Sequence, residues 1–189
     1  MDNIISFSKE SLRSEMRQLR KSLHASISIS ASQNVLKNLL LLLTNVKKIG
    51  VYYALGSELN LSPVIEYALE SEIEVFLPVA YKENRLMRFE KIIQQTESRP
   101  VFYPEDYQLA SETKCYNLDL VLLPLVAVDL KGYRLGQGGG YYDTTFASLA
   151  ERPLLCGVGY ADQLLDLVPH DDWDLQLDYF VSEQRLIKF

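Results

Sequence analysis

The chain has 189 residues, of which 48% are hydrophobic and 23% charged, so its composition is that of a globular protein rather than a disordered one. Its formal net charge of −6 argues against broad binding to nucleic acids or anionic membranes, because both require a basic surface. The longest aliphatic run, 39–43, is far shorter than the roughly 20 residues that cross a bilayer. The segment 1–17 lacks the pattern of a secretion signal. We therefore expect one domain over 1–189, cytoplasmic and monomeric, that binds neither nucleic acid nor membrane.

Two helices open the chain. Apolar residues recur at helical spacing in 8–23 and again in 30–45, which predicts two amphipathic helices. A short β-branched and aromatic segment, 48–54, predicts the first strand. Pro63 fits the first turn of a helix that runs to about residue 70.

Strands alternate with helices through the rest of the chain. The segment 94–117 has no clean period, and no element is assigned to it. The remaining elements, in chain order, are strands at 74–79, 85–93 and 119–124, a helix at 141–150, a strand at 154–160, a helix or turn at 163–167 and a strand at 179–182. The apolar run at 119–124 is typical of a buried parallel strand. This alternation predicts one α/β domain, a parallel-rich sheet between helices.

The clearest chemical signal is the glycine-rich segment 131–143, KGYRLGQGGGYYD. Glycines allow positive φ angles and close approach of the backbone to a ligand. The helix expected after them offers free N–H groups and the positive end of its dipole to an anion. Arg134 adds forked donors that suit phosphate oxygens, and Asp143 is a candidate ligand for Mg²⁺. The segment lacks the Gly-Lys-Ser/Thr of a Walker loop, and taken alone it also fits a structural turn.

One string of residues resembles the main motif of the 5-formyltetrahydrofolate cyclo-ligase family: Arg134-Leu135-Gly136-x-Gly138-x-Gly140-Tyr141-Tyr142-Asp143, preceded by 123–129 and Gly132. The similarity extends over most of the chain, from the basic N-terminal helix to the tail around Trp173-Asp174. It implies a three-layer sandwich with a mixed, mostly parallel sheet and helices on both faces. It also implies an enzyme that converts 5-formyltetrahydrofolate to 5,10-methenyltetrahydrofolate, splitting ATP to ADP and phosphate with Mg²⁺.

The same resemblance implies a role for individual residues. The nucleotide group comprises Lys9, Arg13, Arg134, Leu135, Gly136, Gln137, Gly138, Gly139, Gly140, Tyr141 and Tyr142, with Arg134 also catalytic. The folate group comprises Tyr53, Leu55, Glu58 and Tyr141. The metal carboxylates are Asp143 and, on the alignment of the tail alone, Asp178.

Several of these residues have a structural alternative. By spacing alone, Lys9 and Arg13 fit a solvated helix face and Glu58 fits a surface turn. Tyr52 and Tyr53 alternate along a strand, so one faces the core and only the other can meet a ligand. Two other functions also stay open. One is a sugar-phosphate isomerase or CoA transferase that needs a phosphate loop but no ATP, and the other is a non-catalytic regulator that binds folate or nucleotide.

Some residues are expected to have no chemical role. Cys156 lies in the apolar run 154–158, so we expect a buried small hydrophobe rather than a nucleophile. Trp173 is expected to pack inside the protein, and Asp171-Asp172 to form an acidic surface turn.

Overall fold

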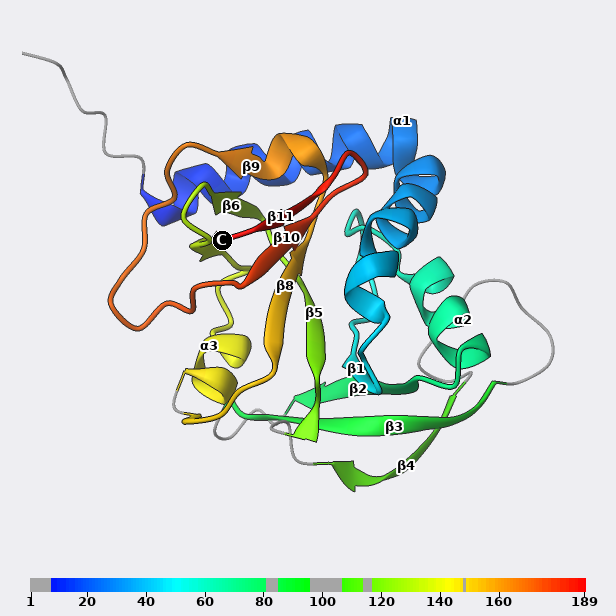
Figure 1. Cartoon of the computed structure of the whole chain (residues 1–189). Coiled ribbons are helices and arrows are strands. Elements are labelled where there is room, and N and C mark those ends of the chain that lie inside the picture. Colours follow the sequence, from blue (N-terminus) through cyan, green and yellow to red (C-terminus); the bar gives the residue numbers. More distant parts are fainter. Residues whose placement is uncertain (1–7, 81–84, 96–106, 114–116, 148) are drawn as a thin grey trace, which may run out of the picture.

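The computed structural model describes residues 8–80, 85–95, 107–113, 117–147 and 149–189, and Figure 1 shows their arrangement. Helices and strands alternate over 9–80 and again over 134–165, while the described residues between these two ranges form strands but no α-helix. In chain order the elements are α1 (Lys9–Leu43), β1 (Lys48–Gly50), α2 (Ser62–Glu70), β2 (Glu74–Ala80), β3 (Met87–Gln95), β4 (Tyr107–Thr113), β5 (Leu120–Pro124), β6 (Ala127–Asp129), β7 (Arg134–Leu135), α3 (Tyr141–Phe146), β8 (Leu154–Val158), the 3₁₀ turn η3 (Ala161–Gln163), β9 (Leu164–Leu165), β10 (Tyr179–Val181) and β11 (Leu186–Lys188).

Within the described residues, eight strands form one mixed sheet in the order β11-β10-β8-β5-β1-β2-β3-β4. The central strands β10, β8, β5, β1 and β2 are parallel, while β11, β3 and β4 join antiparallel. The predicted α/β class with a mixed, mostly parallel sheet is confirmed. After β1 the chain builds one side of the sheet and later places β5 on the other side, so the strand order reverses between β1 and β5. In α/β sheets such a reversal opens a crevice beyond the carboxyl ends of the strands.

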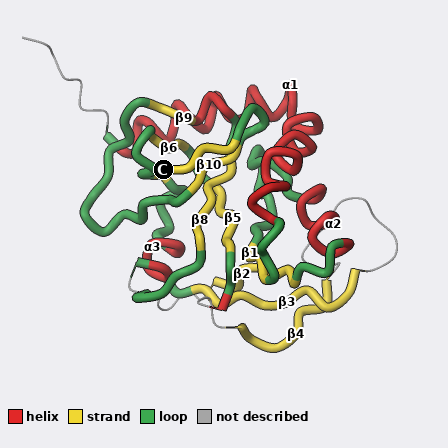
Figure 2. Tube along the Cα trace, viewed as in Figure 1, coloured by secondary structure: helices red, strands yellow, loops and turns green. Residues whose placement is uncertain are grey.

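The two faces of the sheet are covered by different helices. Along β5, Leu120 and Leu122 belong to the core formed with α1 and α2, whereas Val121 and Leu123 belong to the core that contains Phe146 of α3. All four β5 side chains are fully buried, which explains why this strand is apolar at every position. Figure 2 shows α2 and the second half of α1 on one side of β5 and β8, and α3 on the other.

A single helix, α1, takes the place of the two helices predicted at 8–23 and 30–45, so the predicted break was wrong. The intervening serines do not end the helix. The hydroxyls of Ser26, Ser30 and Ser32 donate to carbonyls of the preceding turn, which satisfies them within the helix and favours bending. Figure 1 shows α1 bending between its two halves. Although α1 has 35 residues, neither it nor any other described helix is apolar enough to cross a membrane.

A second, three-stranded sheet, β7-β6-β9, lies beneath the first half of α1 and was not predicted. Leu12 and Met16 of α1 pack against Val126, Ala127 and Leu135. Its strands have only two or three residues, too few to show a period in the sequence. This small sheet matters because β7 ends where the glycine-rich loop begins.

The observed helices and strands differ from the predicted ones more in where they begin and end than in their type. The first strand stops at Gly50 rather than residue 54, and the helix predicted at 141–150 ends at Phe146. Strand β11 was missed; it pairs antiparallel with the predicted final strand. Most of the unassigned segment 94–117 lies outside the described residues, apart from the end of β3, strand β4 and residue 117.

Candidate active site

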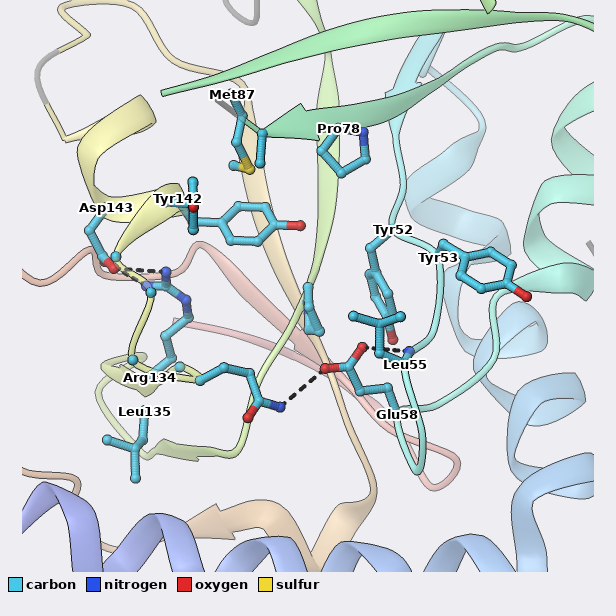
Figure 3. Close-up of a pocket in the computed structure, with 18 of the residues that line it drawn as sticks. Tyr52, Tyr53, Leu55, Glu58, Pro78, Met87, Arg134, Leu135, Tyr142 and Asp143 are labelled. Atoms are coloured by element: carbon cyan, nitrogen blue, oxygen red, sulfur yellow. Dashed lines mark hydrogen bonds and ion pairs between the residues drawn. The ribbon is translucent and has the colours of Figure 1, made fainter. Parts of the chain in front are cut away.

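A cavity of about 720 Å³ opens where the carboxyl ends of β1, β2 and β5 meet the glycine-rich loop. It therefore lies at the reversal of strand order, the usual ligand position in open α/β sheets. Its volume falls within the roughly 300–1,000 Å³ typical of small-molecule sites. Figure 3 shows Arg134 and Asp143 at one end of the cavity and Glu58 with Tyr52 at the other.

The cavity brings together all but one of the residues assigned to the site from the sequence. These residues come from α1, from the loop after β1, and from β7 with the glycine loop and the start of α3 that follow it, three regions that are far apart along the chain. The assigned residues that line it are Lys9, Arg13, Tyr53, Leu55, Glu58, Arg134, Leu135, Gly136, Gln137, Gly138, Gly139, Gly140, Tyr141, Tyr142 and Asp143.

The exception is Asp178, which does not line the cavity. Its carboxylate accepts hydrogen bonds from Arg152 at 2.5 and 3.2 Å and from the backbone N–H of Leu155 at 2.7 Å. These contacts hold the start of β8. The prediction that Asp178 shares a metal site with Asp143 thus finds no support in its position.

Arg134 and Asp143 form a bidentate ion pair, with nitrogen–oxygen distances of 2.8 and 3.2 Å. Asp143 also accepts from the backbone N–H of Leu175 at 3.1 Å. Arg134 is 6% exposed, and its Nε is buried with no hydrogen-bond partner among the described residues. A guanidinium held in this way keeps a fixed direction, and its charge is balanced by a carboxylate at the edge of the cavity.

The glycine loop is built to leave its backbone open to the cavity. Gly138 and Gly140 have φ angles of +100° and +70°, which residues with a Cβ rarely adopt. In the described part of the chain, no group accepts a hydrogen bond from the backbone N–H groups of 137–140. Because α3 has only six residues, these N–H groups contribute more to an anion site than the helix dipole that the sequence suggested.

Two arginines of α1 tie this loop to the helix. The Nε of Arg13 donates to the carbonyl of Gly136 at 2.9 Å. Arg17 donates to both the side-chain and the backbone oxygen of Gln137, each at 3.1 Å. The basic face of α1 is therefore not simply solvated, and it covers the start of the loop.

Lys9 lies between two carboxylates, a setting that differs from the solvated helix face suggested by its spacing alone. Its Nζ donates to Asp171 at 2.6 Å and to Asp174 at 2.5 Å. Burial lowers the pKa of Lys9, but the hydrogen bonds to both aspartates outweigh it, so this pKa lies above its ordinary value. Asp174 lines the cavity and was missed from the sequence, while Asp171 does more than form an acidic turn.

Glu58 is 5% exposed, so the alternative that it lies in a surface turn was wrong. One oxygen accepts from the backbone N–H of Leu55 at 3.0 Å, and the other accepts from the side-chain amide of Gln137 at 3.1 Å. Arg20 lies 3.7 Å from the second oxygen and is itself buried. Burial, partly offset by the charge of Glu58, lowers the pKa of the Arg20 guanidinium.

The expectation that only one of Tyr52 and Tyr53 can meet a ligand was wrong, because β1 ends at Gly50 and both side chains line the cavity. Tyr52 is buried in the core, and its hydroxyl donates to the carbonyl of Leu59 at 2.8 Å, whereas Tyr53 is half-buried; both line the cavity. Burial raises the pKa of both Tyr52 and Tyr142, so these phenols stay protonated. The apolar wall completes the site and was not assigned from the sequence; it includes Leu77, Pro78, Val79, Ala80, Met87 and Pro124.

Two expectations about residues outside the site have opposite outcomes. Cys156 is fully buried, and burial raises the pKa of its thiol, which confirms a structural role. Trp173 is 69% exposed, so the prediction that it packs inside the protein was wrong.

The fold and the cavity define an α/β protein whose cavity combines a glycine loop and fixed cations with a partly apolar wall. The sequence profile of the 5-formyltetrahydrofolate cyclo-ligase family matches residues 5–183, and the chain belongs to this family. The resemblance seen in the sequence, and with it the expectation of an enzyme, is confirmed.

Individual relatives agree along almost their whole length. The 5-formyltetrahydrofolate cyclo-ligase of Haemophilus influenzae is 26% identical, with 89% of this chain and 94% of that protein covered. The solved structure of a 5,10-methenyltetrahydrofolate synthetase from Aquifex aeolicus is 27% identical, with a TM-score of 0.76 over 95% of this chain and 92% of that one. The corresponding structure from Mycoplasma pneumoniae is 25% identical, with a TM-score of 0.75 over 94% and 99%.

Proposed function

We propose that this protein converts 5-formyltetrahydrofolate to 5,10-methenyltetrahydrofolate, with ATP and Mg²⁺, and releases ADP and phosphate. The observation that carries the proposal is the joining of two kinds of wall in one cavity. One wall has the open glycine loop and its cations, and the other has a buried carboxylate, tyrosines and apolar side chains. Relatives named for this reaction, similar over nearly their whole length, support it.

The loop end of the cavity suits the triphosphate of ATP. Backbone N–H groups of 137–140 and the guanidinium groups of Arg13 and Arg134 offer donors to phosphate oxygens, and Lys9 adds a further cation. Asp143 fits a Mg²⁺ ion, because this ion takes one or two carboxylates and completes its shell with phosphate and water. Among the described residues, no group of three or more acidic, histidine or cysteine side chains is arranged to hold a metal ion, so phosphate oxygens would have to supply ligands. Bound Mg²⁺ would neutralise phosphate charge.

The opposite end suits a reduced folate. Glu58 can accept the N–H donors along the pterin edge, because a carboxylate has acceptor sites beyond the two that Leu55 and Gln137 use. Tyr53, Leu55 and Tyr141 then contact the rings, and the apolar wall excludes water.

The chemistry follows from these two positions. A formamide oxygen is a poor leaving group, and transfer of the γ-phosphoryl group to it creates a good one. N10 of the folate then attacks the formyl carbon and loses its proton, and the carbon–oxygen bond breaks to release phosphate and leave the methenyl bridge. Phosphoryl transfer needs mainly positioning and charge stabilisation, which Arg134 provides directly at the phosphoryl group.

An absorbance assay tests the proposal. Purified protein is mixed with 5-formyltetrahydrofolate, ATP and Mg²⁺, and the methenyl product is followed in the near ultraviolet. We expect the band to grow only when all three are present, with one ADP formed for each product molecule. No growth, when an active relative turns over in the same buffer, would overturn the proposed function.

A further inference from the structure

Gln137 connects three parts of the molecule that the proposed reaction must bring together. Its side-chain oxygen and its backbone oxygen accept from Arg17 of α1, each at 3.1 Å. Its side-chain nitrogen donates to Glu58 at 3.1 Å, the bond drawn as a dashed line between the two ends of the cavity in Figure 3. One residue of the glycine loop thus contacts both the helix above it and the carboxylate at the far end.

The direction of this amide is fixed by its neighbours. An amide oxygen facing Arg17 meets a donor, and an amide nitrogen facing Glu58 meets an acceptor. The reverse orientation would place oxygen against a carboxylate and nitrogen against a guanidinium, so both contacts would be repulsive. Gln137 therefore links the two groups in a defined orientation, although it is an exposed residue.

Glu58 depends on such a link because it is a buried charge. It is held on one oxygen by the Leu55 backbone, while Arg20 approaches the other only to 3.7 Å, beyond hydrogen-bond distance. Gln137 supplies the hydrogen bond that fixes this second oxygen. The orientation of the carboxylate consequently depends on the position of the glycine loop.

We propose that Gln137 is a positioning residue that couples occupation of the glycine loop to the orientation of Glu58, so that nucleotide and folate strengthen each other's binding. The inference rests on the proposed function for the identity of the two ligands. A phosphate-bearing ligand that orders the loop also orders Gln137. Glu58 then loses less conformational entropy when the pterin binds. Because coupling between two sites is reciprocal, folate raises nucleotide affinity by the same factor.

The first test uses the protein without ligands. Deuterium exchange is followed in the segment 55–59 of the full chain and of Gln137→Glu. This variant keeps an acceptor for Arg17 but sets a carboxylate against Glu58, so we expect faster exchange in 55–59. Gln33→Ala, at an exposed position of α1, is the control and should match the unmodified protein. Unchanged exchange in Gln137→Glu would overturn the link itself.

The second test measures coupling. Calorimetry gives the Kd of 5-formyltetrahydrofolate with and without a non-hydrolysable ATP analogue and Mg²⁺, and the ratio of the two values is the coupling factor. We expect a factor of about fivefold or more in the unmodified protein and in Gln33→Ala, falling to about one in Gln137→Ala and Gln137→Glu. A factor of one in the unmodified protein, or an equal factor in the Gln137 variants, would overturn the inference. So would a purely structural effect, in which both Kd values weaken by the same factor.

Failure of the reaction and failure of the coupling are distinguishable. Absence of turnover in the unmodified protein overturns the proposed function, while the exchange measurement still decides whether Gln137 links the loop to Glu58. Turnover with intact coupling in Gln137→Ala leaves the function standing and overturns the link. In the expected case, the KM for folate measured at saturating ATP rises in Gln137→Ala by more than kcat falls.

Discussion

The two carboxylates assigned to metal binding from the sequence, Asp143 and Asp178, lie in closely similar local settings. Each forms a bidentate pair with an arginine, Arg134 for the first and Arg152 for the second. Each also accepts one backbone N–H, at 3.1 and 2.7 Å respectively. Local bonding alone therefore does not separate a carboxylate of the cavity from a carboxylate that fixes a strand.

The surroundings of the two arginines make the difference. The side chain of Arg134 is 4% exposed and lies in the cavity wall beside the glycine loop, whereas that of Arg152 is 29% exposed and does not line the cavity. A buried cation next to open backbone donors can act on a ligand at low local dielectric, while a partly solvated pair contributes little beyond local structure. The same pair of residue types thus occupies two different settings in one chain, the cavity wall and the start of β8.

Removal of each arginine should give the largest contrast. We expect Arg134→Ala to lower kcat by about 10²–10³-fold or more, because it removes a preorganised donor to the transferred phosphoryl group. Arg152→Ala, the matched control, should leave kcat within about twofold. The measurement is steady-state turnover of both variants, with circular dichroism to confirm that each is folded. Near-normal activity of Arg134→Ala would remove its assigned role.

A charge-preserving change then isolates geometry from charge. Arg134→Lys keeps the cation but cannot make the forked contact with Asp143. We expect turnover between that of Arg134→Ala and that of the unmodified protein. Equal activity of the lysine variant and the unmodified protein would show that charge alone suffices there.

The second largest contrast concerns metal dependence. Asp143→Asn should raise the Mg²⁺ concentration needed for half-maximal activity, because an amide is a weaker ligand than a carboxylate, and we expect a shift of about tenfold or more. Asp178→Asn should leave the Mg²⁺ titration unchanged and lower the free energy of unfolding only slightly. Magnesium titrations at saturating ATP, combined with urea unfolding, measure both effects. A shift in Asp178→Asn equal to that in Asp143→Asn would restore Asp178 to the metal site.

Lys9 offers a third, smaller test of how cations at the cavity are held. It is already paired with Asp171 and Asp174, so its removal leaves two carboxylates near the proposed phosphates. We expect Lys9→Ala to raise the KM for ATP by about five- to tenfold with a smaller effect on kcat, consistent with loss of one charge-assisted hydrogen bond. Lys21→Ala, on the exposed surface of α1, is the control. An unchanged KM would place Lys9 among structural contacts only.

The sequence predicted the residues of the cavity better than the contacts that hold these residues in place. The string from Arg134 to Asp143 identified the loop, because glycines and a fixed cation in one run are visible in the chain itself. The hydrogen bond between Glu58 and Gln137 joins residues about eighty positions apart, and a local sequence period cannot predict such a contact. The burial of Glu58 could not be predicted for the same reason. The pair of Asp178 with Arg152 is equally invisible to a local pattern, because the pairing of β8 with β10 brings these two residues together.

The boundaries of α1 and the short strands also depend on contacts between distant residues. The serine-rich middle of α1 weakens the apolar period, so two helices were predicted, yet its hydroxyls bond within the helix and packing of both halves keeps it continuous. The short strands of the second sheet had no period to detect, and the contacts with Leu12 and Met16 that bury them come from α1. Tertiary packing determines these features, and the local pattern of a single sequence does not show which segments pack together.

Alkaline titration should give the smallest effect and should separate Lys9 from the two arginine pairs. The pKa of Lys9 lies above its ordinary value of 10.5 in the folded protein, so its contribution to stability is complete below that value and is lost as pH rises through the folded-state pKa. The arginine pairs keep their charge throughout this range. We therefore expect the difference in urea midpoint between the unmodified protein and Lys9→Ala to shrink from pH 8 to pH 11 and beyond, while the difference for Arg152→Ala stays constant. A difference for Lys9→Ala that does not change with pH would mean that its contacts with the aspartates do not depend on its charge.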